Sequence, residues 1–229
     1  MKSKIISMVL IILILTLVIT GCGNNNSEDS DFETRIKAKD EKISELENRI
    51  KELETDIDNE VSISNSLIVH AINTMKIIKN RDMEKLSTIV HPTKGIRFTP
   101  YPYVEIDSDQ VFQREQLISA LKSSQTYTWG NYDGSGEEII LTFKDYYDRF
   151  VYDEDFANPQ LIGNNIIVGQ GNTEENVVKA YPNGKFIEFY FSGFKSEYGG
   201  ADWRSLKLVF EQEEGTWYLV GIIHGEWTI

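Results

Sequence analysis

Isoleucine recurs at every seventh position between residues 36 and 57, and a leucine follows two of these isoleucines by three positions. Such spacing, with isoleucine at heptad position a and leucine at d, is typical of a coiled coil of two parallel strands. The stretch 32–60 also lacks proline and glycine, so a helical stalk is predicted there, roughly 45 Å long at ~1.5 Å per residue. The seam residues are Ile36, Ile43, Leu46, Ile50, Leu53 and Ile57.

The charges beside this seam distinguish parallel from antiparallel pairing. In a parallel pair each g residue meets the next e residue of the partner, and all three such pairs join opposite charges. An antiparallel partner would bring the acidic e residues together, so we predict a parallel homodimer through residues 36–57. A single solvated helix stays open as the alternative, because Lys39 and Glu60 occupy d positions. The three pairs are Arg35 with Asp40, Lys42 with Glu47, and Arg49 with Glu54.

A second apolar pattern occupies the start of the chain. Two lysines precede an apolar run over residues 5–19, and the run leads to the tetrapeptide ITGC, which ends at Cys22 and resembles the bacterial lipobox. These features predict a signal peptide over 1–21 and lipidation of Cys22, which would anchor the protein on the extracytoplasmic face of the cell membrane. An uncleaved membrane helix is the alternative. The small, polar and acidic residues of 22–31 predict a flexible tether.

Beyond residue 65 the pattern becomes that of a globular domain, predicted over 66–229. Apolar residues at helical spacing come first, and the alternation typical of strands comes last. This order predicts an α+β domain with helices packed on a curved antiparallel sheet. Helices are expected near 67–78, 83–90, 111–122 and 143–150, and strands near 138–141, 165–169, 186–191, 206–211 and 217–223.

Local signals inside the domain add detail. Asp82 and Thr142 are expected to cap the helices that follow them. Residues 126–136 predict a turn-rich loop with exposed aromatic side chains, and residues 100–103 an extended edge. In the strand at 206–211, bulky apolar residues alternate with serine, lysine and valine. We therefore expect one face of that strand to be buried and the other to be partly wet.

The predicted domain contains the segments KGIRFTPYPYV, YTWGNYDGSG, DWRSLKLVF and WYLVGIIHGEWTI. These four segments resemble a family of uncharacterised lipoproteins from Gram-positive bacteria, and the order of elements resembles the cystatin-like cone of the nuclear-transport-factor-like superfamily. The resemblance covers residues 66–229. It implies a curved sheet around a cone pocket, but no activity, because that superfamily holds both enzymes and binding modules.

Composition narrows the function. The chain has 36 acidic and 23 basic residues and a formal charge of -13, which excludes a general affinity for nucleic acid. The single cysteine excludes disulfides within one chain and multi-cysteine zinc sites. Asp107, Asp109 and the acidic run 153–155 do not fit a calcium-binding loop. No metal and no cofactor is expected.

Three residues are candidates for catalysis. His224, near the end of the last predicted strand, is the best candidate for a general base, with Asp202 or Glu226 as its partner. A structural role for this histidine is the competing interpretation. His91 lies at a predicted helix end before Pro92, where an imidazole can cap the last carbonyl groups.

Ligand-binding candidates include two guanidinium groups. Arg97 and Arg204 would suit a small polar or anionic ligand in a cone pocket, although Arg204 could instead form a local ion pair with Asp202. Aromatic residues in the predicted loops would either form a recognition surface for a glycan or a protein or pack over the sheet. These aromatic candidates are Tyr101, Tyr103, Trp129 and Tyr132.

Together these patterns predict a membrane-anchored binding or interaction module without catalytic activity. The membrane is its one predicted partner besides a second copy, and a protein or glycan partner stays unidentified. Two alternatives stay open: an envelope enzyme of the hydrolase type that uses His224 in a cone pocket, and an architectural protein in which the stalk dimer matters most.

Overall fold

The computed structural model describes residues 28–228, without the side chains of 28–31, 64 and 65. The predicted signal peptide, Cys22 and most of the predicted tether lie outside the described residues. The chain divides into two units, Met1–Asp58 and Asn59–Ile229. Within 28–228, no helix combines the length and the hydrophobicity needed to cross a membrane.

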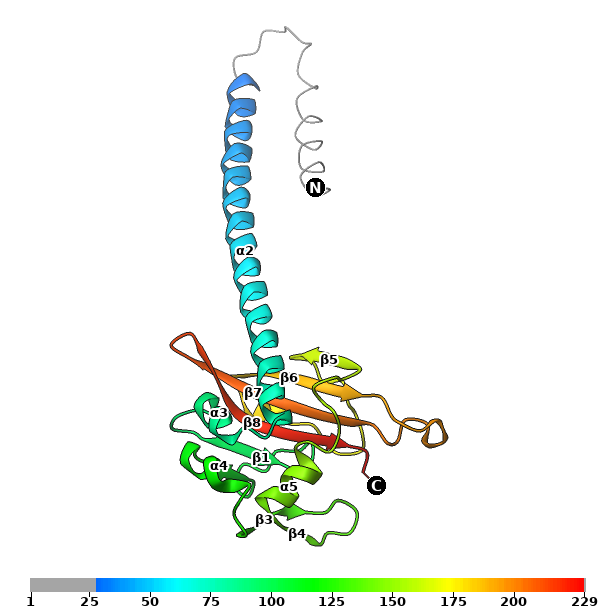
Figure 1. The fold of residues 1–229 in the computed structure, drawn as a ribbon. Coiled ribbons are helices and arrows are strands. Elements are labelled where there is room, and N and C mark those ends of the chain that lie inside the picture. Colours follow the sequence, from blue (N-terminus) through cyan, green and yellow to red (C-terminus); the bar gives the residue numbers. More distant parts are fainter. Residues whose placement is uncertain (1–27, 229) are drawn as a thin grey trace. The chain divides into compact units, whose positions relative to one another are not determined.

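One helix, α2 (Glu28–Lys79), contains both the predicted stalk and the first predicted helix of the domain (Figure 1). It begins inside the predicted tether and continues through residues 59–66, where the heptad pattern stops. These residues include neither proline nor glycine, so the coiled-coil seam ends while the helix does not. In this single chain the six seam residues are 43–59% exposed.

The second unit contains a six-stranded sheet in the order β2-β1-β8-β7-β6-β5 and a two-stranded sheet of β3 and β4. Neighbouring strands are antiparallel except β1 and β8, which are parallel. The predicted α+β class is therefore confirmed. The strands are β1 (Ile96–Thr99), β2 (Gln110–Phe112), β3 (Thr126–Asn131), β4 (Glu138–Thr142), β5 (Leu161–Asn164), β6 (Gly184–Phe191), β7 (Arg204–Glu213) and β8 (Thr216–Glu226).

Short helices begin where the sequence supplies caps. The Asp82 carboxylate accepts the backbone N–H of Lys85 at 3.0 Å, and the Thr142 hydroxyl accepts that of Asp145 at 3.1 Å, as predicted. The predicted helix at 111–122 is shorter than expected because residues 110–112 pair with β1 instead. The helices are α3 (Met83–Ile89), α4 (Arg114–Ala120), α5 (Phe143–Phe150), α6 (Val177–Ala180) and the 3-10 turn η1 (Ser196–Tyr198).

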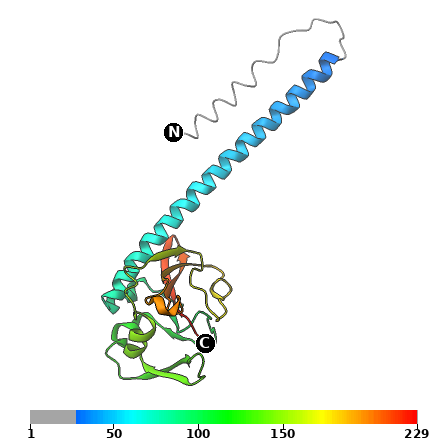
Figure 2. The same cartoon turned by 90° about the vertical axis from the view of Figure 1, so that its right-hand side faces the viewer.

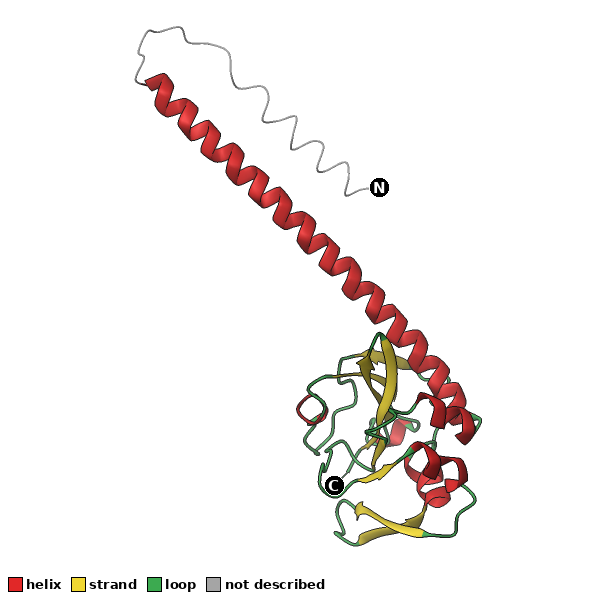
Figure 3. Cartoon of the chain, turned by 90° about the vertical axis from the view of Figure 1, so that its left-hand side faces the viewer, coloured by secondary structure: helices red, strands yellow, loops and turns green. Residues whose placement is uncertain are grey.

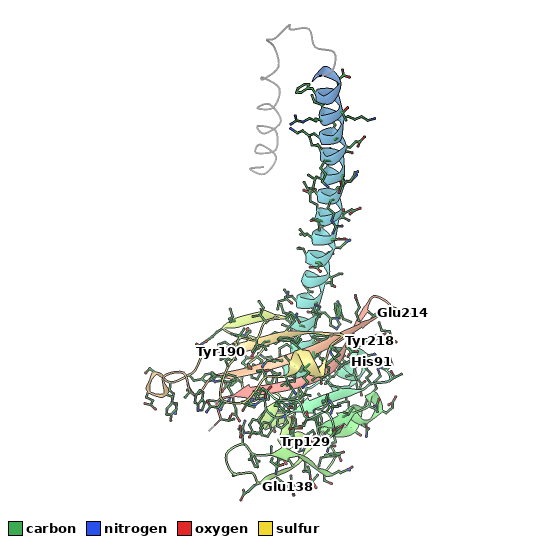
Figure 4. All side chains as sticks on the ribbon, turned by 180° about the vertical axis from the view of Figure 1, so that it is seen from behind. His91, Trp129, Glu138, Tyr190, Glu214 and Tyr218 are labelled. Carbon is green, nitrogen blue, oxygen red and sulfur yellow. The ribbon has the colours of Figure 1, made fainter. Side chains whose placement is uncertain are left out.

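The main core lies between one face of the six-stranded sheet and α3, α4, α5 and the end of α2 (Figure 3). Trp129, labelled in Figure 4, is the largest of its fully buried side chains. Its ring stacks on that of Tyr146 at 3.8 Å, and its indole N–H donates to the Leu141 carbonyl. The prediction of an exposed loop at 126–136 was therefore wrong for Trp129. Residues 126–131 form β3, which pairs with β4 beside α5 (Figure 2).

The opposite face of the sheet is also covered, which corrects the expectation of a wet face. Ser205, Lys207 and Val209 are 0% exposed because residues 165–182, including α6, pack over them. Residues 165–169 do not form the predicted strand, and β5 precedes them. The backbone N–H groups of Val168 and Gly169 instead donate to the Glu188 carboxylate, at 2.6 and 3.2 Å.

Candidate functional site

An open cleft of about 570 Å³ lies between the loop that follows β1 and the hairpin of β3 and β4. We call it the tyrosine cleft, after its lining residues Tyr101, Tyr103 and Tyr132. Tyr103 is 37% exposed, while Tyr101 and Tyr132 are half-buried and rest against the ring of Phe150 at 5.8 and 6.5 Å. Three of the aromatic candidates, Tyr101, Tyr103 and Tyr132, thus meet at one surface. Trp129 contributes only from its buried position at the base.

Local sequence chemistry builds the two walls of the cleft. Two prolines flank Tyr101 and restrict the backbone of the first wall. In the second wall, Gly134 and Gly136 have positive φ angles of 84° and 71°, a conformation that glycine adopts readily. The Thr173 hydroxyl donates to the Asp133 carboxylate at 3.1 Å and links this hairpin to the segment that covers the opposite face.

Asp109 lies in this cleft and is only 9% exposed. Its Oδ2 accepts the Thr99 hydroxyl at 2.6 Å and the Glu105 backbone N–H at 3.1 Å, while Oδ1 accepts no hydrogen bond from the described residues. Burial raises the pKa of this carboxyl to about 6, against the opposing effect of its two hydrogen bonds and of Arg97. Sequence analysis had considered Asp109 only as a calcium ligand.

Arg97, a predicted ligand-binding residue, supports the cleft wall from behind. Its guanidinium donates to the backbone carbonyls of Ile106 at 2.9 Å and of Asp109 at 3.3 Å. These bonds hold the loop that presents Asp109. The lining itself contains Glu105, Asp109 and Asp133 and no lysine, arginine or histidine, so the cleft is negatively charged.

His224 belongs to a separate charge cluster, which lies where β7 begins and β8 ends. Its Nε2 lies 3.2 Å from Oδ2 of Asp153, and the same oxygen accepts Nε of Arg204 at 3.2 Å. Arg204 also pairs with Glu226 at 3.1 Å, and Arg149 donates to Glu226 at 2.5 Å. Burial by itself would raise the pKa of Asp153, but its interactions with His224 and Arg204 lower it below the ordinary value.

The structure does not bring the predicted acid Asp202 to His224. Asp202 accepts the Lys195 backbone N–H at 2.9 Å, and the partner of His224 is Asp153, which lies 71 positions away in the sequence. Glu226 joins the cluster only through the two arginines. The His224 side chain is 0% exposed and does not line the tyrosine cleft, so a ligand in that cleft would not reach the imidazole.

Arg204 does not form the expected ion pair with Asp202, because its guanidinium faces Asp153 and Glu226. His91 also differs from its predicted role. Its Nδ1 accepts the backbone N–H groups of Thr93 and Lys94, at 3.3 and 3.2 Å, so it caps the following turn and not the end of α3. Its ring packs against that of Tyr218 (Figure 4).

A third set of charged residues links the sheet to residues 165–182, which cover its opposite face. Lys207 Nζ is fully buried and contacts Glu175 at 2.6 Å and Glu188 at 3.3 Å. This set was not predicted from the sequence, because the alternation of apolar and polar residues along the strand indicated that Lys207 faces solvent. In residues 28–228, no group of three or more histidine, cysteine or acidic side chains is arranged to hold a metal ion.

Comparisons with models of protein families, with curated proteins and with solved structures give no match for this chain. The function is therefore inferred from the residues of this chain and their geometry.

Proposed function

We propose that this protein is a lipid-anchored binding module on the extracytoplasmic face of the cell membrane, and that the tyrosine cleft is its binding site. One contrast carries the proposal. The cleft offers three tyrosines and an unused carboxylate oxygen at an open surface, whereas the His224 side chain is fully buried beside Asp153. Concave sites with aromatic walls and a few polar groups are typical of ligand binding.

The packing of the domain favours the tyrosine cleft, and not a cone pocket, as the binding site. Aromatic rings, including those of Phe98, Trp129 and Tyr146, fill the space between the helices and the sheet. A ligand would therefore bind at the loops and not inside the helix-covered face. Membership of the cystatin-like superfamily is part of the proposal and is supported by the element order, helices first and a strand hairpin last.

The anchor is proposed from the sequence around Cys22. The charged start, the apolar run and the ITGC motif are together typical of bacterial lipoproteins, as set out above. A lipid with two acyl chains on Cys22 would hold the protein firmly on the membrane.

A parallel dimer through residues 36–57 is proposed as the oligomeric form. The six exposed seam residues form an apolar stripe that a second copy of the same helix would cover. In this register the g and e charges of the two copies are complementary at all three heptad junctions. A single chain uses some of these charges internally, as in the Lys42–Glu45 and Arg49–Glu52 pairs, which are solvent-exposed and weak.

Affinity capture tests the binding function. The full chain in detergent is used as bait for solubilised cell envelopes, beside Tyr103→Ala and the matched control Tyr198→Ala, an exposed tyrosine outside the cleft. We expect the wild type and the control to retain the same component, and Tyr103→Ala to retain at least about fivefold less. Equal retention by all three chains would contradict the proposed site.

A further inference from the structure

We propose that the ligand of the tyrosine cleft carries an ammonium group, which pairs with Asp109 while the tyrosine rings surround it. This inference rests on the proposed function, because it names the chemistry of the ligand for that same cleft. The ammonium group belongs either to a lysine side chain of a polypeptide or to a free small amine.

The position of Asp109 is the first argument. The residue is more than nine-tenths buried, it lines the cleft, and only Oδ2 is used by Thr99 and Glu105. Because the Asp109 side chain as a whole is buried, its negative charge is costly unless a donor or a cation compensates it. The nearby Arg97 directs its hydrogen bonds to backbone carbonyls of the loop and not to this carboxylate. A cationic donor that enters the cleft would complete it.

The remaining lining supports a cation over an anion. Glu105 and Asp133 add two more acidic side chains, and no basic residue lines the cleft. The tyrosine rings carry negative potential on their faces, which attracts organic cations within about 6 Å. An anionic ligand would meet repulsion from all of these groups.

The same lining favours an organic cation over a metal ion. Metal sites need several closely spaced ligands, and the described residues contain no group of three or more acidic, histidine or cysteine side chains able to hold one. Aromatic walls around a single inward carboxylate suit an alkylammonium group, whose methylene chain contacts the rings while the charged end reaches the acid.

Three probes test the charge requirement: Nα-acetyl-lysinamide, the monocation n-pentylamine, and Nα-acetyl-norleucinamide, which replaces the ammonium by a hydrogen. Binding to the full chain in detergent is measured by calorimetry and by ligand-observed NMR. We expect the two ammonium probes to bind at least tenfold more tightly than the norleucine probe. Tighter binding of the lysinamide would indicate a polypeptide ligand, and tighter binding of n-pentylamine a free amine.

Asp109→Asn is the matched variant, because the amide can keep the Thr99 and Glu105 bonds while it removes the charge. The variant should weaken the binding of the ammonium probes at least tenfold. Asp107 is an exposed acid outside the cleft, so Asp107→Asn should leave their binding unchanged. Thermal unfolding of each variant checks that the domain remains folded.

Other results would overturn the inference. Equal binding of the norleucine probe, or unchanged ammonium binding in Asp109→Asn, would exclude the ammonium contact. In these cases loss of capture by Tyr103→Ala would still support the cleft as the binding site. If no probe binds and Tyr103→Ala captures normally, the ammonium inference and the proposed site both fail.

Discussion

At the scale of single residues, Asp109 shows how a binding group can reduce the stability of a fold. Its carboxyl is buried beside another acid, Glu105, and its pKa is raised from 3.8 to about 6. The folded protein therefore binds this proton more tightly than the unfolded chain does. The unfolding free energy must fall as the pH rises from about 4 to about 6, and the loss is complete above that range.

Asp109→Asn should consequently stabilise the protein at pH 8. A pKa difference of this size corresponds to up to about 3 kcal/mol, because each pKa unit is worth about 1.4 kcal/mol. Urea unfolding of the variant and the wild type at pH 8 and at pH 4 measures the effect. The gain should be large at pH 8 and should shrink toward pH 4. An equal effect at both values would show that the charge of Asp109 is not what costs stability.

At the scale of elements, the buried Lys207 on β7 joins β6 to the segment that covers the sheet, through Glu188 and Glu175. Removal of one member of a buried ion pair leaves uncompensated charge and typically costs about 3–5 kcal/mol. We expect this loss for Lys207→Met, measured by urea unfolding at pH 7. Replacement of Glu188 and Glu175 by glutamine in the same chain should recover part of the loss. A cost below about 1 kcal/mol for the single variant would contradict the role of Lys207.

The stalk of α2 gives a second prediction at this scale. Ile43→Asp with Ile50→Asp places like charges in the apolar seam, where each isoleucine is expected to contribute about 1.5–3 kcal/mol on burial. Sedimentation equilibrium of the full chain in density-matched detergent should find a dimer for the wild type and a monomer for the variant. Asn48→Asp, at position f outside the seam, is the control and should stay dimeric. A monomeric wild type would support the alternative of a single solvated helix.

At the scale of the whole molecule, Cys22→Ser tests the anchor. Without the thiol no lipid can be attached, so labelling with an alkyne analogue of palmitate should be lost, and Triton X-114 partition shows which protein enters the detergent phase. The wild type should carry the label and stay in that phase. Unlabelled wild-type protein in the detergent phase would indicate an uncleaved membrane helix.

The sequence predicted what depends on neighbouring residues. The α+β class, the caps at Asp82 and Thr142 and the C-terminal hairpin follow from local pattern and local hydrogen bonds. The sequence did not predict contacts between segments that lie far apart along the chain. The pairing of Asp153 with His224 and the burial of Lys207 depend on packing between segments that no periodicity relates.

The candidate site was predicted in part, for the same reason. Proline and glycine around Tyr101, Tyr103 and Trp129 indicated loops with aromatic residues, and the two tyrosines do line one cleft. Trp129 lies in the core instead, because residues 126–131 pair with β4. The inward position of Asp109 depends on Thr99, ten residues earlier, and carries no local signal.

The most direct test of ligand binding at the tyrosine cleft is photo-crosslinking in living cells. A benzophenone amino acid replaces Tyr103 in the cleft, or Tyr198 as the control at an exposed site elsewhere. The account predicts a specific adduct at position 103 that is absent at position 198 and is reduced by Asp109→Asn. The same adducts at both positions, or none at position 103, would contradict it.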